Sequence, residues 1–140
     1  MNWNNIDIIE HTGDIGIRFT ASSREELFRS AAMTMVNLIC PDAKILKKSK
    51  KMIAVSGDDN EQLLVNWLSE INFLFQTEQF LPAQISITEI KGMSLKAQIC
   101  GDKITGQDVE IQNDIKAVTY HRISIRQMNG TWSGQVIFDV

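Results

Sequence analysis

The sequence lacks several features that would place it among membrane, secreted or nucleic-acid-binding proteins. No apolar run approaches the ~20 residues that span a bilayer, and residues Met1–Asn5 lack the basic and apolar regions of a signal peptide. The two cysteines, Cys40 and Cys100, are far apart, which predicts reduced thiols in a cytoplasmic protein. A net charge of −3 argues against sequence-independent nucleic-acid binding, which needs a basic surface. We therefore expect a cytoplasmic protein with little direct nucleic-acid binding and no membrane segment.

Motifs for catalysis are scarce as well. The sequence has no Gly-x-Ser-x-Gly nucleophile motif, no cysteine next to a base and no Gly-rich phosphate loop. Two cysteines and two histidines, His11 and His121, do not have the spacing of zinc ligands. The residues thus favour neither covalent catalysis, nor a nucleotide site of the phosphate-loop type, nor a zinc site.

The patterns that are present predict one domain over residues 1–140, without repeats or linkers. Residues 15–21 alternate between apolar and polar, as a half-buried strand does. Ser22–Glu26 offers a capping box for a helix, with Ser22 or Ser23 as the cap, and this helix ends by Cys40 because proline follows. A second helix is predicted from about residue 60 to residue 77, where apolar residues recur every three or four positions.

Two hairpins follow the second helix in the sequence. Gln84–Ile90 and Met93–Cys100 alternate around a Lys-Gly turn, and Ile115–Gln127 and Thr131–Phe138 flank Asn129-Gly130, a strong hairpin signal. The residues between the hairpins are polar and acidic and predict a long loop. The fold class is therefore α+β, with an antiparallel or mixed sheet covered by two main helices.

Acidic residues lie at two places that the fold could bring together, the first turn and the end of the last strand. Asp14 lies between Gly13 and Gly16, and Asp139-Val140 follow the last predicted strand. Asp14 alone reads as an Asx turn. If the first loop meets the last strand, however, Asp14, Asp139 and the terminal carboxylate of Val140 form an oxygen-only site that suits Ca²⁺, Mg²⁺ or Mn²⁺.

Other noticeable residues have ordinary interpretations beside the functional ones. A lone strand histidine such as His121 is more often structural than catalytic. Lys44–Lys51 carries five lysines, which suit either RNA contact or, without interleaved aromatic residues, a solvated loop that blunts the edge of the strand Met52–Ser56. Phe73 lies off the apolar stripe of the second helix, which makes it a candidate for a partner surface.

Four segments together resemble the archease family. His11–Gly16 resembles the family's His-Thr-Ala-Asp-Ile-Gly motif, and Leu63–Glu70 resembles its second-helix motif. Ile115–His121 is similar to its Val-Lys-Ala-Val-Thr-Tyr-His strand, and Val136–Val140 to its closing segment. The segments occur in the family's order along the whole chain.

The resemblance implies a protein that is not itself an enzyme. Archeases assist the RtcB-type RNA ligase of tRNA splicing and RNA repair by promoting guanylylation of the ligase and multiple turnover. The implied divalent-metal site maps to Asp14, Asp139 and Val140, with Ca²⁺ as the first candidate ion and Mg²⁺ or Mn²⁺ as alternatives. His11, Lys116 and His121 lie in the matching motifs and are candidate functional or partner-contact residues.

The resemblance also implies a strand–helix–strand–strand module with an inserted α/β unit. Two departures from the family pattern are visible: Gly13 replaces an alanine, and residues 105–113 lack a histidine that the family often has there. Two other functions fit the residues. One is a chaperone-like modulator of RNA-modifying enzymes such as tRNA methyltransferases. The other is a metal-dependent hydrolase with Asp14 and Asp139 as ligands and His121 as base.

Overall fold

The computed structural model describes residues 5–41, 44–106 and 109–140, and the side chain of His11 lies outside that description. Four strands come from the two ends of the described chain: β1 (Ile6–His11), β2 (Asp14–Ala21), β6 (Ala117–Met128) and β7 (Thr131–Asp139). The elements between them are α1 (Arg24–Ile39), β3 (Ser49–Ser56), α2 (Asn60–Glu78), β4 (Phe80–Lys91) and β5 (Ser94–Lys103).

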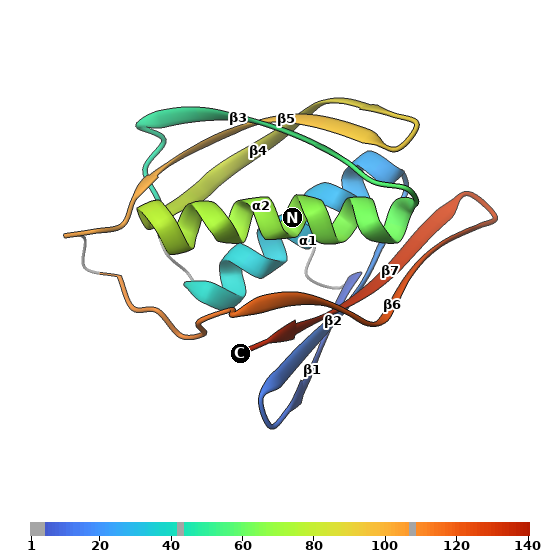
Figure 1. Cartoon of the computed structure of the whole chain (residues 1–140), viewed down its shortest axis with the longest axis horizontal. Coiled ribbons are helices and arrows are strands. Elements are labelled where there is room, and N and C mark those ends of the chain that lie inside the picture. Colours follow the sequence, from blue (N-terminus) through green and yellow to red (C-terminus); the bar gives the residue numbers. More distant parts are fainter. Residues whose placement is uncertain (1–4, 42–43, 107–108) are drawn as a thin grey trace.

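These strands form two sheets with the helices between them (Figure 1). In the described part of the chain, the four-stranded sheet has the order β1-β2-β7-β6 and the three-stranded sheet the order β3-β5-β4, and every pairing is antiparallel. The α+β class is confirmed, and β3, α2, β4 and β5 are the unit inserted between α1 and β6. The alternation patterns did not predict that the strands divide between two sheets.

Both helices begin with a side-chain cap. The Ser23 hydroxyl accepts a hydrogen bond from the amide of Glu26 at 3.1 Å, so Ser23, rather than Ser22, caps α1. The Asp59 carboxylate accepts from the amide of Gln62 at 2.7 Å and caps α2. The helix α1 ends before Cys40, as the following proline predicts.

The core lies between the two sheets and contains the inner faces of both helices. From the four-stranded sheet, alternate residues of β2 and β7 are buried, including Ile17, Phe19 and Phe138. The helices pack against each other and against both sheets. The fully buried Trp67 of α2 donates from its indole nitrogen to the carbonyl of Phe28 in α1 at 2.9 Å. The buried indole therefore has its hydrogen bond and links the two helices.

The two predicted hairpins are present. The strands β4, β5 and β7 are longer than expected, whereas β6 begins at Ala117, two residues after the predicted start. Asn129 and Gly130 both have positive φ, 53° and 79°, as the central residues of a type I′ turn do. The strand β4 begins at Phe80, directly after α2, because Gln79 takes a left-handed conformation (φ 54°) that reverses the chain without a glycine. The strand β3 likewise begins at Ser49, three residues before the predicted start.

The connector between β5 and β6 lies against the C-terminal ends of both helices. Gln112 N donates to the carbonyl of Ile39 at 2.8 Å, and Asn113 Nδ2 donates to the carbonyl of Leu38 at 2.7 Å. Asn72 of α2 donates to the carbonyl of Ile115 at 2.9 Å. The first two bonds satisfy carbonyls at the end of α1 that have no partner within the helix. Together with the Asn72 bond, they fix the path of the chain into β6.

The two cysteines are free thiols, as predicted. Cys40 is buried, and this burial raises the pKa of its thiol, which keeps it protonated and unreactive. No helix in the described residues is long and apolar enough to cross a membrane.

Candidate functional site

Asp14 and Asp139 lie directly opposite each other on neighbouring strands. Asp14 is the first residue of β2, Asp139 is the last residue of β7, and the antiparallel register pairs them. Opposite residues of paired strands project from the same face of the sheet. The first turn of the chain therefore meets the last strand, which was the condition for an anionic cluster.

Backbone hydrogen bonds fix the end of the sequence beside the first turn. Val140 N donates to the carbonyl of Gly13 at 3.0 Å, and Lys116 N donates to the carbonyl of Asp139 at 2.8 Å. Gly13 has a φ of 80°, which a glycine adopts without strain. Val140 and Lys116 are thus held next to Asp139 by main-chain contacts, whereas the Lys116 side chain is exposed.

The outer face of the four-stranded sheet contains a cleft of about 330 Å³ next to Asp14. Alternation along β2 places Asp14, Gly16 and Arg18 on this face, because Ile15, Ile17 and Phe19 point into the core. His121 and Arg122 of β6 and Gln135 of β7 also line the cleft. His121 is exposed.

His121 reaches this cleft because β6 is irregular. Between Thr119 opposite Ile137 and Ser124 opposite Gln135, β6 has four residues and β7 has one. Thr119 Oγ1 donates to the carbonyl of Ile137 at 2.8 Å and accepts from His121 N at 3.3 Å. The threonine hydroxyl therefore stabilises the bulge at the point where the ladder is interrupted.

A second chain of contacts holds the bulge from the neighbouring strands. Arg18 Nε donates to Gln135 Oε1 at 2.8 Å, and Gln135 Nε2 donates to the carbonyl of Arg122 at 2.9 Å. Arg122 has a φ of 52°, which is unusual for a residue with a side chain. The alternation of β2 could have indicated Arg18, but the bulge that brings Arg122 and Gln135 to the site has no signature in the strand pattern.

The structure brings some of the predicted site residues together and places the others nearby. Asp14, Asp139 and Val140 come together at one corner of the sheet, and Lys116 and His121 lie on β6 or just before it. The backbone of His11 pairs with Asp14, and its side chain is in the part that the structure leaves undescribed. Among described residues no three His, Cys, Asp or Glu side chains form a metal-binding group. The donors that lie together are the carboxylates of Asp14 and Asp139. Oxygen ligands of this kind suit Ca²⁺, Mg²⁺ or Mn²⁺.

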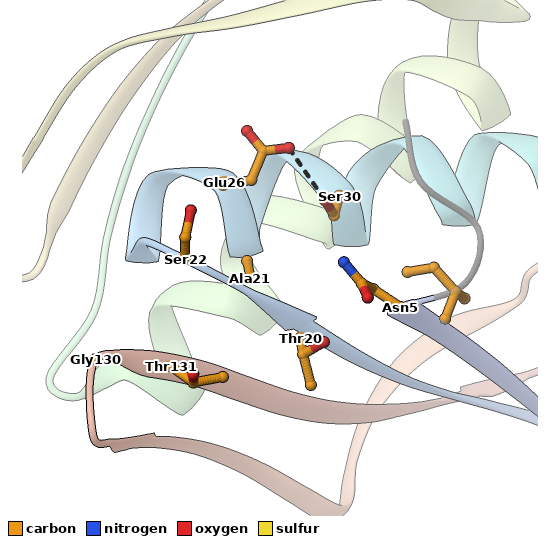
Figure 2. Close-up of a pocket in the computed structure, with 9 residues that line it drawn as sticks. Asn5, Thr20, Ala21, Ser22, Glu26, Ser30, Gly130 and Thr131 are labelled. Atoms are coloured by element: carbon orange, nitrogen blue, oxygen red, sulfur yellow. Dashed lines mark hydrogen bonds between the residues drawn. The ribbon is translucent and has the colours of Figure 1, made fainter.

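A second cleft, of about 350 Å³, lies where α1 begins (Figure 2). Its lining includes Thr20 of β2, Thr131 of β7 and Glu26 of α1. The Glu26 carboxylate is already bonded to Arg29 and to the Ser30 hydroxyl. This second cleft contains none of the predicted site residues.

Comparison with known proteins gives one consistent family. The model of the archease protein family (MTH1598/TM1083) matches residues 7–140. The archease of Pyrococcus abyssi is 35% identical over 136 residues, which cover 94% of this chain and 95% of that protein. The archease of Methanosarcina mazei is 31% identical over 138 residues, with 96% and 94% coverage.

Two solved structures share the fold. Protein 1598 of Methanobacterium thermoautotrophicum superposes with a TM-score of 0.81 at 25% identity, over 97% of this chain and 99% of that one. A Thermotoga maritima protein described as an archease and possible chaperone gives 0.68 at 22% identity over 94% of each chain, which is a likeness of fold alone. The family match over nearly the whole chain and the relatives above 30% identity agree: this chain belongs to the archease family.

Proposed function

We propose that this protein activates an RtcB-type RNA ligase in tRNA splicing and RNA repair, by promoting guanylylation of the ligase and its multiple turnover. The observation that carries the proposal is the pairing of Asp14 with Asp139 at an exposed corner of the sheet. Two carboxylates at one register position repel each other unless a cation or a cationic partner group lies between them. A cation or a cationic group of the partner would relieve this repulsion.

Asp14, Asp139 and the terminal carboxylate of Val140 would hold a divalent cation, with Ca²⁺ as the first candidate and Mg²⁺ or Mn²⁺ as alternatives. In nucleotidyl transfer such a cation neutralises charge that develops on phosphate oxygens. The protein's own contribution is to hold the donors in place. The Lys116 amide fixes the carbonyl of Asp139, and the Gly13 carbonyl fixes the amide of Val140.

The protein is proposed to act on its partner and to catalyse no reaction alone. The sequence has no nucleophile motif, and the described cleft beside Asp14 is lined by Arg18, His121 and Arg122, with no serine or cysteine next to a base. Lys116 and His121 are exposed close to the paired carboxylates and are proposed to contact the ligase. Such surface groups suit recognition of a partner's active site more than an independent reaction centre.

The test is a guanylylation assay of the cognate ligase. Transfer of labelled GMP to the ligase is measured with and without this protein, in Mg²⁺, Mn²⁺ and Ca²⁺. Turnover is measured by RNA ligation with the ligase first in excess of the RNA substrate and then below it. We expect faster guanylylation and more than one turnover only when the protein is present. Glu89→Gln, an exposed change on the other sheet, is the matched control for Asp139→Asn. No stimulation at any protein ratio, or ligation by the protein alone, would contradict the proposal.

A second candidate function is that of a chaperone-like modulator of RNA-modifying enzymes such as tRNA methyltransferases. It is favoured by the description of the Thermotoga maritima neighbour as a possible chaperone. Contact alone would then suffice, so Asp139→Asn would leave the effect on the partner enzyme unchanged. The same variant abolishes stimulation in the ligase proposal, which separates the two functions.

A further inference from the structure

The three-stranded sheet has two edges that differ in regularity. The edge strand β4 contains Pro82, and its register with β5 shifts twice, between Pro82 and Gln84 and between Ile87 and Glu89. The other edge strand, β3, pairs with β5 residue for residue from Ser49 to Ser56, without a shift. Prolines, bulges and charged residues are the usual means by which a sheet edge is protected from pairing. β3 has no proline and no bulge, and its lysines lie only in and before its first three residues, so the stretch from Met52 to Ser56 is unprotected.

The register shows which backbone groups of β3 point away from the sheet. Gly57 N donates to the carbonyl of Met93 on the β5 side at 3.0 Å. Because inward and outward groups alternate along an antiparallel strand, Val55 and Ile53 also face β5, whereas Ala54 and Met52 face outward. The outward carbonyl of Ser56 accepts from Asn66 Nδ2 of α2 at 2.7 Å, which fixes one end of the edge. Ala54 and Met52 are exposed.

A shallow groove of about 440 Å³ runs beside this edge. One wall is the end of β3 at Val55 and Ser56, and the other is formed by Asn66, Ser69, Glu70 and Phe73 of α2. Glu70 is exposed and acidic, so the positive charge that complements an acidic segment lies at the lysine end of the edge and not in this wall. The spacing of three or four residues places the α2 positions on one side of the helix. The Phe73 side chain is 57% exposed, although it is a large apolar group. A strand added to β3 would cover this side of α2 and bury the Phe73 ring.

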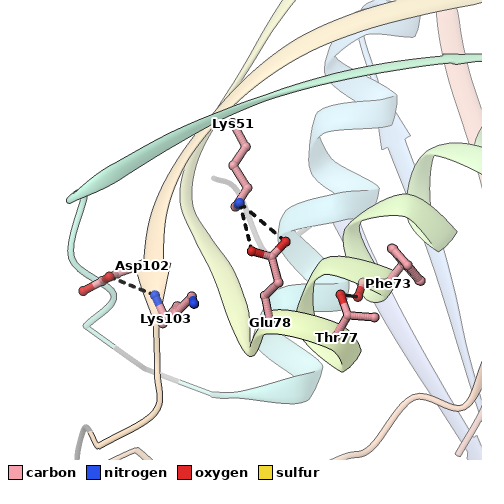
Figure 3. Close-up of polar contacts among 6 residues, drawn as sticks. All are labelled: Lys51, Phe73, Thr77, Glu78, Asp102 and Lys103. Atoms are coloured by element: carbon pink, nitrogen blue, oxygen red, sulfur yellow. Dashed lines mark hydrogen bonds and ion pairs between the residues drawn. The ribbon is translucent and has the colours of Figure 1, made fainter.

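Lysines give the edge its charge. Lys47, Lys48 and Lys50 are exposed on the segment that leads into and begins β3. Lys51 instead faces the helix layer, where its Nζ lies 3.2 Å from Glu78 Oε1 at the end of α2 (Figure 3). The same Nζ lies 5.2 Å from the centre of the Phe80 ring. The inward lysine is therefore already neutralised, and the exposed lysines are left to attract an acidic partner.

We propose that β3 and the adjacent face of α2, here called the β3–α2 groove, bind an extended acidic segment of a partner protein by strand addition. The outward backbone groups of Met52 and Ala54 pair with the segment, its acidic residues lie along Lys47–Lys50, and an apolar residue packs on Phe73. The groove lies on a different sheet from Asp14 and Asp139, so this binding does not depend on the proposed ligase function.

The probe is a labelled synthetic peptide of about ten residues with alternating glutamate and valine, the length of an ordinary strand. Its counterpart has lysine in place of glutamate. We expect fluorescence anisotropy to show binding of the glutamate peptide alone, weakening as salt is raised. Hydrogen exchange should show protection of the Met52 and Ala54 amides on binding.

Two variants test the geometry. Ala54→Pro removes an outward amide without removing a bond to β5, because proline is tolerated on the solvent side of an edge strand. Phe73→Ser removes the exposed ring and tests the groove even if the proline variant folds poorly. Each should weaken peptide binding by at least about tenfold. Met128→Ser, which changes an equally exposed apolar residue on the other sheet, should bind as the unmodified protein does.

Several results would overturn the proposal. They are equal binding of the lysine peptide, absence of binding by the glutamate peptide, and full binding by both folded variants. Protection of the Met52 and Ala54 amides that depends on protein concentration without peptide would instead assign the edge to a second copy of the chain.

Discussion

At the residue scale, the paired aspartates combine a cost in stability with the proposed binding of a divalent cation. Asp14 and Asp139 face the same side of the sheet at one register position, and Asp139 is exposed. Like charges directly opposite each other destabilise a pair of strands. The same arrangement attracts a cation, so a change at Asp139 is expected to move stability in opposite directions with and without the ion.

The first prediction therefore concerns Asp139→Asn. In chelator, this variant should be about 0.5 kcal/mol more stable than the unmodified protein, because the repulsion with Asp14 is removed. In excess Ca²⁺ or Mn²⁺ the order should reverse, because ligand binding stabilises only a folded state that holds the ion. Thermal unfolding in both conditions measures this, with Glu89→Gln as the control. If the cation raises the unfolding temperature of the variant and of the unmodified protein equally, Asp139 is not a ligand.

A second residue-scale prediction tests the bulge that presents His121. Thr119→Val keeps the shape of the side chain but removes its hydrogen bonds to Ile137 O and His121 N. The loss should cost about 1 kcal/mol in the free energy of unfolding. The NMR signals of His121 and Arg122 should shift or broaden, while those of Thr20, on β2 beyond β7, should not. Unchanged His121 and Arg122 signals would mean that the Gln135 contact alone holds the bulge.

At the scale of elements, the helices are stabilised at their two ends by different means. Local side chains cap the starts of α1 and α2, whereas the connector before β6 supplies the groups that bond the end of α1. The starts could therefore be read from nearby sequence. The contacts at the ends join residues far apart in the chain, such as Leu38 and Asn113.

The third prediction is that Asp59→Ala weakens α2. The carboxylate that bonds the Gln62 amide is lost, and an N-cap of this type contributes about 1 kcal/mol to the free energy of unfolding. Chemical denaturation measures the change. Asp58→Ala is the matched control, because Asp58 takes part in the cap only through its backbone amide, which bonds Gln62 Oε1. Equal destabilisation by the two variants would show that general charge, not capping, is responsible.

The elements also show how far the sequence alone leads. The Asn129-Gly130 turn, the serine cap of α1 and the apolar stripe of α2 depend on neighbouring residues, and each was predicted. The left-handed Gln79 was not, because a residue with a side chain gives no signal for that conformation. The bulge after Thr119 was also missed, since it depends on the Gln135 side chain from another strand. Of the site, the positions of Asp14 and Asp139 were predicted, whereas Arg18, Arg122 and Gln135 were not.

At the scale of the whole molecule, the pairing of β2 with β7 joins the first and last parts of the chain in one sheet (Figure 1). The inserted β3–β5 unit builds the second sheet on the far side of the helices. The paired carboxylates and the β3–α2 groove therefore lie on different sheets, which leaves room for two separate contacts. A partner at one surface need not block the other.

The last prediction concerns a variant in which a few residues are added after Val140. The Val140 amide is fixed to the Gly13 carbonyl, so a few added residues would convert its carboxylate into a neutral amide beside the paired aspartates. Thermal stability should change little, because β7 and its pairing with β2 remain. Cation affinity, measured by calorimetry, and stimulation of ligase guanylylation should fall together, towards the defect of Asp139→Ala. Deletion of Asp139 and Val140 should have the same effect. An extended form that binds the cation and activates the ligase as well as the original would reduce the site to Asp14 and Asp139.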